Sequence, residues 1–260
     1  MNRRRTLRSR LKNGDIIFGL FYKMNSPVAT ELIGLAGFDF IVIDGEHSPM
    51  GYESMENMVR CSENVGLETV IRVPCASEEH IFHALDSGAS GVQIPNMTSV
   101  KEFEDSVKSA KYYPEGCRGL SKQTRACKYG LWNTETDGNY TQVANENSLV
   151  VVHIENKEMA VEAGKICEIP QIDVLFIGPA DMSQSMGVPG KTDNPRVVET
   201  AMRVIQTANE YGKVAGINVT NEAEMKQYIE AGARYIMYNS DTAAFIKGLK
   251  STASQFEQYR

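Results

Sequence analysis

Short apolar runs alternate along this chain with longer stretches whose apolar residues recur at helical spacing. Eight of the runs are rich in Val, Ile and Phe and predict strands buried on both faces, as in parallel sheets. The predicted strands are Ile16–Tyr22, Phe40–Asp44, Glu68–Val73, Gly91–Pro95, Leu149–Glu155, Asp173–Gly178, Val214–Asn218 and Tyr235–Ser240.

A helix is predicted after each strand. Ser99 with Glu102 forms a capping box, and Glu53–Val65 and Pro195–Tyr211 carry apolar residues on one helical face. Alternating strands and helices indicate an α/β protein with a parallel sheet, and the count of eight favours a closed (β/α)8 TIM barrel. The 260 residues suit one such domain, spanning residues 1–260.

Regular patterning lapses between residues 112 and 147. A connection of this length is usually functional or disordered, and its aromatic residues argue against disorder. These aromatics are Tyr112, Tyr113, Tyr129, Trp132 and Tyr140. We expect the segment to form a lid or an oligomer contact above the carboxyl-terminal face of the barrel.

Composition and charge narrow the classes of protein. The chain is 42% hydrophobic and 23% charged, as in soluble globular proteins, and its net charge of −6 argues against a nucleic-acid partner. No run has the length of a membrane span, so no membrane partner is expected. The basic stretch Met1–Arg10 lacks a following apolar region and is expected to be a solvated arm or a first helix.

The cysteines and glycines add two further expectations. Five cysteines without a CxxC pair indicate a reducing cytoplasmic location. Neither GxGxxG nor GxxxxGK[ST] occurs, which removes the main support for a dinucleotide or P-loop site.

Polar residues gather where the predicted strands end. In a (β/α)8 barrel these carboxyl ends form the active face. The residues are Asp44, Glu46, His47, Arg72, Gln93, Asn96, His153, Glu155, Asp181, Asn218, Asn239 and Asp241.

Two carboxylates in this set suggest a metal site. Glu155 and Asp181 follow nearly continuous apolar strands, where a carboxylate is costly unless it is paired or bound to a metal. Two carboxylates, completed by keto-acid oxygens and water, suit octahedral Mg²⁺ or Mn²⁺. The alternatives are an ion pair with Arg72 and a solvated loop acid.

A second group of residues suggests acid–base chemistry. Asp44 and His47 lie three apart across a Gly turn, and an aspartate that orients an imidazole prepares a general base. Arg72 could stabilise enolate or carboxylate charge, and the backbone amides after Gly178 could hold a carboxylate. The alternatives are a loop histidine capped by its own strand end and an arginine paired with Glu46 or Asp44.

A mechanism through an imine requires a lysine that can form a Schiff base with the substrate. Lys23 follows the first strand and Lys157 begins the fifth helix, so either could form a Schiff base. Neither lies inside an apolar strand, where burial would lower its pKa. We therefore rank imine chemistry below metal-dependent chemistry. His80 and His83 are expected to be surface or packing residues.

Five motifs, taken together and in order, resemble the HpcH/HpaI aldolases over nearly the whole chain. The motifs are Ile43-Asp44-Gly45-Glu46-His47-Ser48-Pro49, Val70–Pro74, Tyr113–Gly119, Ile154-Glu155 and Ile177–Gly187. The resemblance implies a phosphoenolpyruvate/pyruvate-type barrel, usually hexameric. It also implies a carbon–carbon lyase, a class II aldolase that cleaves 4-hydroxy-2-oxo acids into pyruvate and an aldehyde on a divalent metal.

The resemblance also implies roles for single residues. Glu155 and Asp181 would bind Mg²⁺ or Mn²⁺, with Co²⁺ or Zn²⁺ as other candidates. His47 would be the base and Asp44 would orient it, and Arg72 would stabilise the pyruvate enolate.

The backbone amides of Ala180 and Asp181 would bind the pyruvate carboxylate. One position departs from the family, which commonly has glutamine two residues before the metal-binding glutamate, where this chain has His153. We expect His153 to bind substrate, to add a metal ligand or to alter the preference for the acceptor.

Three other readings stay open beside this one. A citrate-synthase-like enzyme could condense keto acids on the same scaffold, and a Schiff-base aldolase would work without metal. A non-catalytic barrel could bind a partner through residues 112–147.

Overall fold

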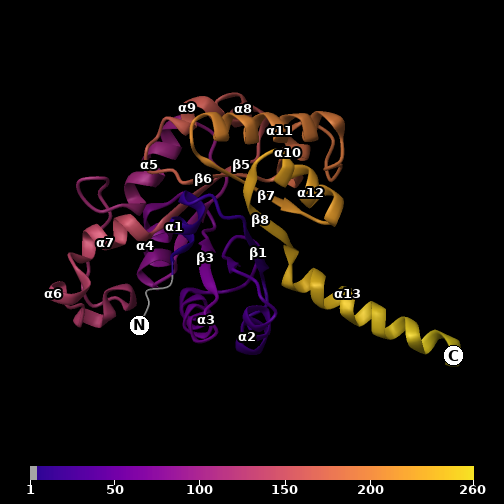
Figure 1. Ribbon diagram of the computed structural model, residues 1–260, viewed down its shortest axis with the longest axis horizontal. Coiled ribbons are helices and arrows are strands. Elements are labelled where there is room, and N and C mark those ends of the chain that lie inside the picture. Colours follow the sequence, from indigo (N-terminus) through magenta and orange to yellow (C-terminus); the bar gives the residue numbers. More distant parts are fainter. Residues whose placement is uncertain (1–4) are drawn as a thin grey trace.

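The computed structural model describes residues 5–260, and its strands form a closed barrel (Figure 1). Each strand pairs in parallel with the next, and β8 pairs with β1. The strands are β1 (Ile17–Tyr22), β2 (Phe40–Asp44), β3 (Glu68–Arg72), β4 (Gly91–Ile94), β5 (Leu149–Ile154), β6 (Val174–Ile177), β7 (Val214–Val219) and β8 (Ala233–Ser240). The predicted TIM barrel is therefore confirmed, with each strand within two residues of its predicted bounds.

Helices follow the strands and cover the barrel. They are α1 (Leu7–Lys12), α2 (Pro27–Leu35), α3 (Tyr52–Asn64), α4 (Glu78–Asp86), α5 (Val100–Ala110), α6 (Thr134–Asp137), α7 (Tyr140–Asn147), α8 (Lys157–Val161), α9 (Ala163–Cys167), α10 (Pro179–Ser185), α11 (Pro195–Glu210), α12 (Glu222–Glu230) and α13 (Asp241–Ala253), with 3₁₀ turns η1 (Arg125–Gly130) and η2 (Ser254–Tyr259). Side chains of Ser, Thr or Asn cap many of them: Ser99, for example, accepts from the amide of Glu102 at the start of α5.

Two apolar clusters hold the fold together. One lies between the strands and the surrounding helices, and the other fills the barrel interior. Leu7 and Leu11 of α1 belong to the interior cluster and are fully or almost fully buried. The helix α1 therefore closes the amino-terminal end of the barrel. This confirms the first-helix expectation for residues 7–12, whereas residues 1–4 of the basic stretch lie outside the described residues.

The segment 112–147 does not lie where the sequence suggested. Arg118 pairs with Asp86, and Arg125 donates to the backbone carbonyl of Ser87, both at the end of α4. Arg8 of α1 donates to the carbonyls of Asn145 and Glu146. These partners precede strands rather than follow them, so the segment packs at the amino-terminal side of the barrel. Figure 1 shows α6 and α7 beside α4 and α1. The expected position above the carboxyl-terminal face is wrong.

The last helix departs from the regular barrel pattern. Instead of packing along the outside of β8 and β1, α13 extends away from the body of the molecule (Figure 1). Its apolar side chains are exposed, and only Asp241 at its start is buried. Asp241 accepts the backbone N–H groups of Lys23 and Met24, 2.9 and 2.8 Å away, which fixes the start of the helix to the end of β1.

The cysteines and the apolar character of the helices are two further features of the chain. Cys61, Cys75, Cys117, Cys127 and Cys167 all carry free thiols. Burial raises the pKa of Cys167 to about 11 and also raises that of Cys127, so neither thiol is prepared as a nucleophile. Across residues 5–260, none of the helices has both the length and the apolar character to cross a membrane.

Candidate active site

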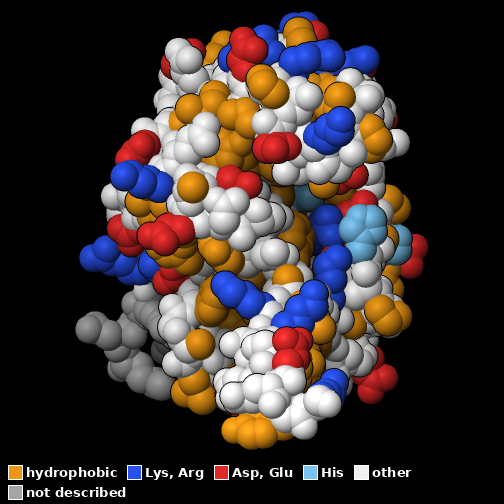
Figure 2. All heavy atoms as spheres, turned by 90° about the vertical axis from the view of Figure 1, so that its right-hand side faces the viewer, with side chains coloured by type: hydrophobic (Ala, Val, Ile, Leu, Met, Phe, Trp, Pro, Cys, Tyr) orange, Lys and Arg blue, Asp and Glu red, His pale blue; other side chains and the backbone are white. Residues whose placement is uncertain are grey.

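A cavity of about 510 Å³ lies at the carboxyl ends of the strands. Most predicted site residues line it, from the loop after β2 to the first turn of α10. They include His47, Arg72, His153, Glu155, Ala180 and Asp181. Figure 2 shows a hollow in this face of the molecule, with histidine beside it and a row of lysine and arginine side chains alongside. Strand-end residues that lie far apart in the sequence therefore come together in space.

Arg72 and Asp44 form the electrostatic centre of the site. The strands β2 and β3 pair with Asp44 opposite Arg72. Arg72 Nε and Nη2 donate to the two carboxylate oxygens of Asp44 over 2.9 and 2.6 Å, and Nη1 lies 2.9 Å from Glu46 Oε2. Burial raises the pKa of Asp44, but Arg72, the His47 amide and Lys23 outweigh it and lower that pKa to about 2. The carboxylate is therefore ionised, and it fixes the guanidinium.

His47 is held by its backbone rather than by its ring. Asp44 Oδ1 accepts the backbone N–H groups of Glu46 and His47. The imidazole is 56% exposed, and its nearest carboxylate is Glu46, 3.7 Å from Nε2. In the structure Asp44 therefore orients the loop and Arg72, and the prediction that it orients the imidazole is wrong. The alternative of a loop capped by its own strand end is correct for the backbone.

Glu155 is a buried carboxylate with both oxygens engaged. Oε1 accepts the backbone N–H of Asn96 over 2.5 Å, and Oε2 lies 2.8 Å from Nδ1 of His153. Burial raises the pKa of Glu155, but His153, the Asn96 amide and Arg72 outweigh it, so that the pKa is lowered overall. Glu155 is thus an ionised carboxylate held in one orientation, with lone pairs left for a further partner.

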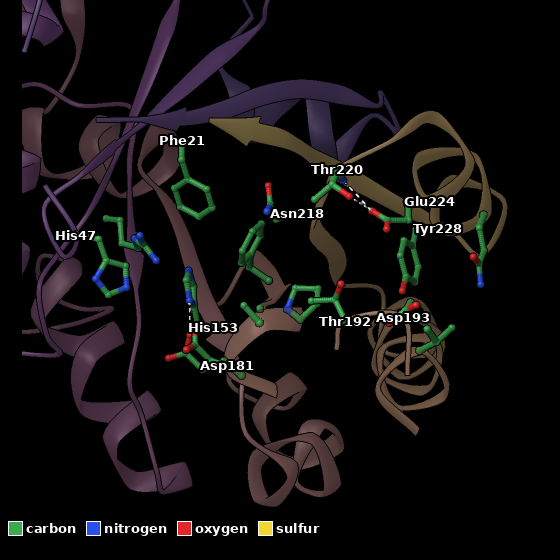
Figure 3. A pocket seen from close by; sticks show the side chains of 18 of the residues that line it. Phe21, His47, His153, Asp181, Thr192, Asp193, Asn218, Thr220, Glu224 and Tyr228 are labelled. Atoms are coloured by element: carbon green, nitrogen blue, oxygen red, sulfur yellow. Dashed lines mark hydrogen bonds and ion pairs between the residues drawn. The ribbon is translucent and has the colours of Figure 1, made fainter. Parts of the chain in front are cut away.

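Asp181 reaches the same cavity from the first turn of α10, where it is exposed. Figure 3 shows its side chain near that of His153. Within residues 5–260, no group of three or more His, Cys, Asp or Glu side chains is arranged to hold a metal ion. The protein itself would thus supply two carboxylates, as the sequence suggested, with other ligands from water or substrate.

A glycine leaves space beside these carboxylates. A Cβ at Gly178 would lie 3.1 Å from Cβ of Glu155 and 3.4 Å from Oε2. Such contacts are tighter than ordinary packing, so the absence of a side chain keeps the surroundings of the carboxylate open.

Several residues of the cavity were not identified from the sequence. Phe21 lies under the guanidinium of Arg72, with Cζ of Arg72 4.4 Å from the centre of the phenyl ring. In Figure 3, His47, His153 and Asp181 lie toward one end of the cavity, and Glu224, Tyr228 and Asp193 toward the other. The latter come from α12 and from the loop before α11, where no strand-end signal marks them.

Other strand-end residues have structural partners instead. Asn218 also lines the cavity, but its Oδ1 accepts the backbone N–H of Asn239. Asp241 caps the turn after β1. His80 and His83 lie on α4, where Tyr52 contacts both rings, as expected for surface or packing residues.

The family follows from comparison with known proteins. The model of the HpcH/HpaI aldolase/citrate lyase family matches residues 17–248. This chain belongs to that family. The predicted carbon–carbon lyase of the aldolase type is thereby confirmed.

Individual relatives cover almost the whole chain. A hydroxypyruvate/pyruvate aldolase of Roseobacter denitrificans is 31% identical over 97% of each chain. A 5-keto-4-deoxy-D-glucarate aldolase of Escherichia coli is 30% identical over 94% of this chain and 93% of its own. The solved structure of the citrate synthase SbnG superposes with a TM-score of 0.88 at 26% identity, covering 98% of each chain.

Proposed function

We propose that this protein is a metal-dependent class II aldolase that reversibly cleaves 4-hydroxy-2-oxo acids into pyruvate and an aldehyde. One arrangement carries the proposal: Arg72, fixed by two carboxylates, faces the same cavity as Glu155 and Asp181. A cation and two acids at one mouth of a barrel suit a reaction in which negative charge develops on a bound keto acid.

The residues fit a divalent cation. Glu155 is ionised and oriented, Asp181 lies in the same cavity, and Gly178 leaves the space beside Glu155 open. Oxygen ligands favour Mg²⁺ or Mn²⁺, with Co²⁺ or Zn²⁺ as other candidates. A divalent cation bound there would supply a Lewis acid that polarises the keto oxygen.

The protein groups divide the remaining work. Two N–H groups of Arg72 donate to Asp44, and Nη1 forms an ion pair with Glu46, so N–H groups remain to stabilise the enolate oxygen of pyruvate. The amides of Ala180 and Asp181, at the start of α10, would hold the keto-acid carboxylate.

His47 is the proposed base. Its exposed imidazole takes the proton from the 4-hydroxyl group, the C3–C4 bond breaks, and the electron pair goes to the pyruvate enolate as the aldehyde forms. Protonation of C3 then gives pyruvate.

The lysines support metal rather than imine chemistry. Lys23 Nζ lies 3.2 Å from Asp44, and its side chain is 31% exposed, so it is ion-paired instead of desolvated. Lys157 lies at the surface, 54% exposed. A catalytic amine needs the lowered pKa that burial provides.

Pyruvate release from a panel of hydroxy-oxo acids tests the function. We expect EDTA to abolish release, Mn²⁺ or Mg²⁺ to restore it, and borohydride with pyruvate to leave the protein unmodified. Full activity after chelation, together with trapping on a lysine, would establish an imine aldolase instead.

The likeness to the citrate synthase SbnG favours one second candidate, a condensing enzyme. Its reaction would consume an acyl thioester or a second keto acid instead of releasing pyruvate. Thioester consumption, measured beside pyruvate release with the same enzyme, separates the two.

We also propose that the protein is a cytoplasmic homo-oligomer, and that a hexamer is the form to test. The free cysteines support the compartment. The exposed apolar side of α13 supports self-association, because single chains rarely expose such a surface.

A further inference from the structure

Inside the barrel, a line of hydrogen bonds joins Tyr235 to Glu155. The Tyr235 hydroxyl donates to Gln93 Oε1 over 3.1 Å, and Gln93 Nε2 lies 2.7 Å from His153 Nε2. His153 Nδ1 then lies 2.8 Å from Glu155 Oε2. All four side chains are buried.

The direction of these bonds selects one form of the imidazole. An amide nitrogen only donates, so Nε2 of His153 accepts from Gln93. The proton of the neutral ring is then on Nδ1 and is donated to Glu155. Each bond in the line therefore points toward the carboxylate.

His153 has no polar atom left for the substrate. Both ring nitrogens are bonded within the protein, and the ring packs on Phe176, with 4.9 Å between ring centres. A direct hydrogen bond to a keto acid would break one of these contacts. This weighs against the expectation that His153 binds substrate.

We propose that His153 is a positioning residue for Glu155, held in place by Gln93 and Tyr235. Its Nδ1–H fixes one carboxylate oxygen, while the Asn96 amide fixes the other. The inference rests on the proposed metal site, in which Glu155 is a ligand. Partners that orient a ligand in this way raise metal affinity and are costly to remove.

Three substitutions of His153 separate the two ring nitrogens. The side-chain nitrogen of asparagine can occupy the place of Nδ1, and that of glutamine the place of Nε2. His153→Leu fills similar space without either. Mn²⁺ affinity, measured by calorimetry, is the first readout, and it does not depend on turnover.

We expect His153→Leu to weaken Mn²⁺ binding roughly 10–100-fold, as found for other outer-shell partners. His153→Asn should recover most of this loss, and His153→Gln less. Tyr235→Phe, which releases only the far end of the line, should weaken binding by a smaller factor. In ¹⁵N NMR spectra of the wild-type protein, Nδ1 of His153 should carry the proton and Nε2 should not.

Specific outcomes would overturn the proposal. Wild-type Mn²⁺ affinity in His153→Leu, with a raised KM for the keto acid, would make His153 a substrate ligand. A ring without a proton on Nδ1 would also contradict it, and this measurement decides the matter if His153→Leu does not fold. Absence of Mn²⁺ binding by the wild-type protein would instead reject the proposed metal site itself.

Discussion

Arg72 is the side chain on which most of the proposed chemistry converges. Its guanidinium touches Asp44 and Glu46, and it lies over the ring of Phe21. A planar fork can make these contacts together, whereas the single ammonium of lysine cannot. The site therefore depends on guanidinium geometry as well as on positive charge.

We predict that Arg72→Lys lowers kcat for pyruvate release by about 10²-fold, in the range found when one oxyanion donor is lost. Mn²⁺ affinity should be almost unchanged, because the substitution keeps the positive charge that helps to lower the pKa of Glu155 and removes neither proposed metal ligand. Steady-state kinetics and calorimetry measure the two effects. Arg118→Lys is a matched control, since Arg118 is a buried arginine paired with Asp86 away from the cavity. A kcat near that of the wild type would count against the enolate role of Arg72.

The lowered pKa of Asp44 predicts how stability responds to acid. In the unfolded chain an aspartate titrates near pH 3.9, whereas in the folded protein Asp44 has a pKa of about 2. Between these values the unfolded state binds more protons. The contribution of Asp44 is therefore complete above about pH 4 and is lost as the pH falls toward 2.

We expect the free energy of unfolding to fall by on the order of 2 kcal/mol across this window through Asp44. Urea unfolding followed by circular dichroism at a series of pH values measures it. In Asp44→Asn the decrease between pH 4 and 2 should be smaller by that amount. Equal slopes in the two proteins would show that Asp44 is not ionised as described.

The residues of the site were predictable where a strand ends and harder to predict where side chains cross the barrel. Asp44, Arg72 and Glu155 were found because each closes or directly follows an apolar run. The alternative that Arg72 pairs with Glu46 or Asp44 is confirmed, because both contacts are present. Local spacing does not reveal the strand register that sets Asp44 opposite Arg72 and Arg72 opposite Gln93. The three-residue spacing of Asp44 and His47 led to a wrong prediction, because the carboxylate accepts the backbone N–H of His47 instead of binding the ring.

Two elements shape the end of the cavity away from His47. The helix α12 contributes Glu224 and Tyr228, and the loop before α11 contributes Asp193. The cations that line the cavity are Lys23 and Arg72, and both contact Asp44. Within residues 5–260, the end of the cavity away from His47 thus has acidic and hydroxyl groups without a lysine or arginine in the lining. We propose that the aldehyde lies at this end.

We predict that uncharged hydroxyaldehydes are better acceptors than aldehydes that carry a carboxylate, because Asp193 and Glu224 repel the second charge. Ratios of kcat/KM for the condensation direction measure the preference. Asp193→Asn should narrow the ratio severalfold, while Glu230→Gln, at the far end of α12, should leave it unchanged. A wild-type preference for the charged aldehyde would contradict this view.

Most elements were predictable because their apolar periodicity is strong. The helix predicted after β5 is divided into α8 and α9, with Glu162 between them at φ −84° and ψ 5°. The position of 112–147 was not predictable, because it depends on long-range partners. Arg8, for instance, reaches Asn145 across 137 positions of sequence.

At the scale of the whole molecule, α13 exposes apolar side chains that a partner would bury. Phe245, Ile246 and Leu249 are about half exposed or more, and the apolar residues Val28, Leu32 and Leu35 of α2 are more exposed still. A second copy of the chain could cover both surfaces. Figure 2, which faces the side from which α13 projects, shows apolar side chains spread over this face.

We predict that Phe245→Asp with Leu249→Asp shifts the protein to smaller species in light scattering coupled to gel filtration, because a buried apolar contact would then hold charges. Lys250→Asp on the same helix is the control and should keep the wild-type mass. A monomeric wild-type protein, or an unchanged mass in the double variant, would remove the role proposed for α13.

The helix α1 has an implication for the order of events in catalysis. Because it closes one end of the barrel, reactants enter and leave through the opposite end. The product bound deepest in the cavity, beside Glu155 and Arg72, should be the last to dissociate, and in the proposed mechanism this product is pyruvate. In the cleavage direction the aldehyde should therefore dissociate before pyruvate. Pyruvate should then inhibit competitively against the hydroxy-oxo acid, and the aldehyde noncompetitively.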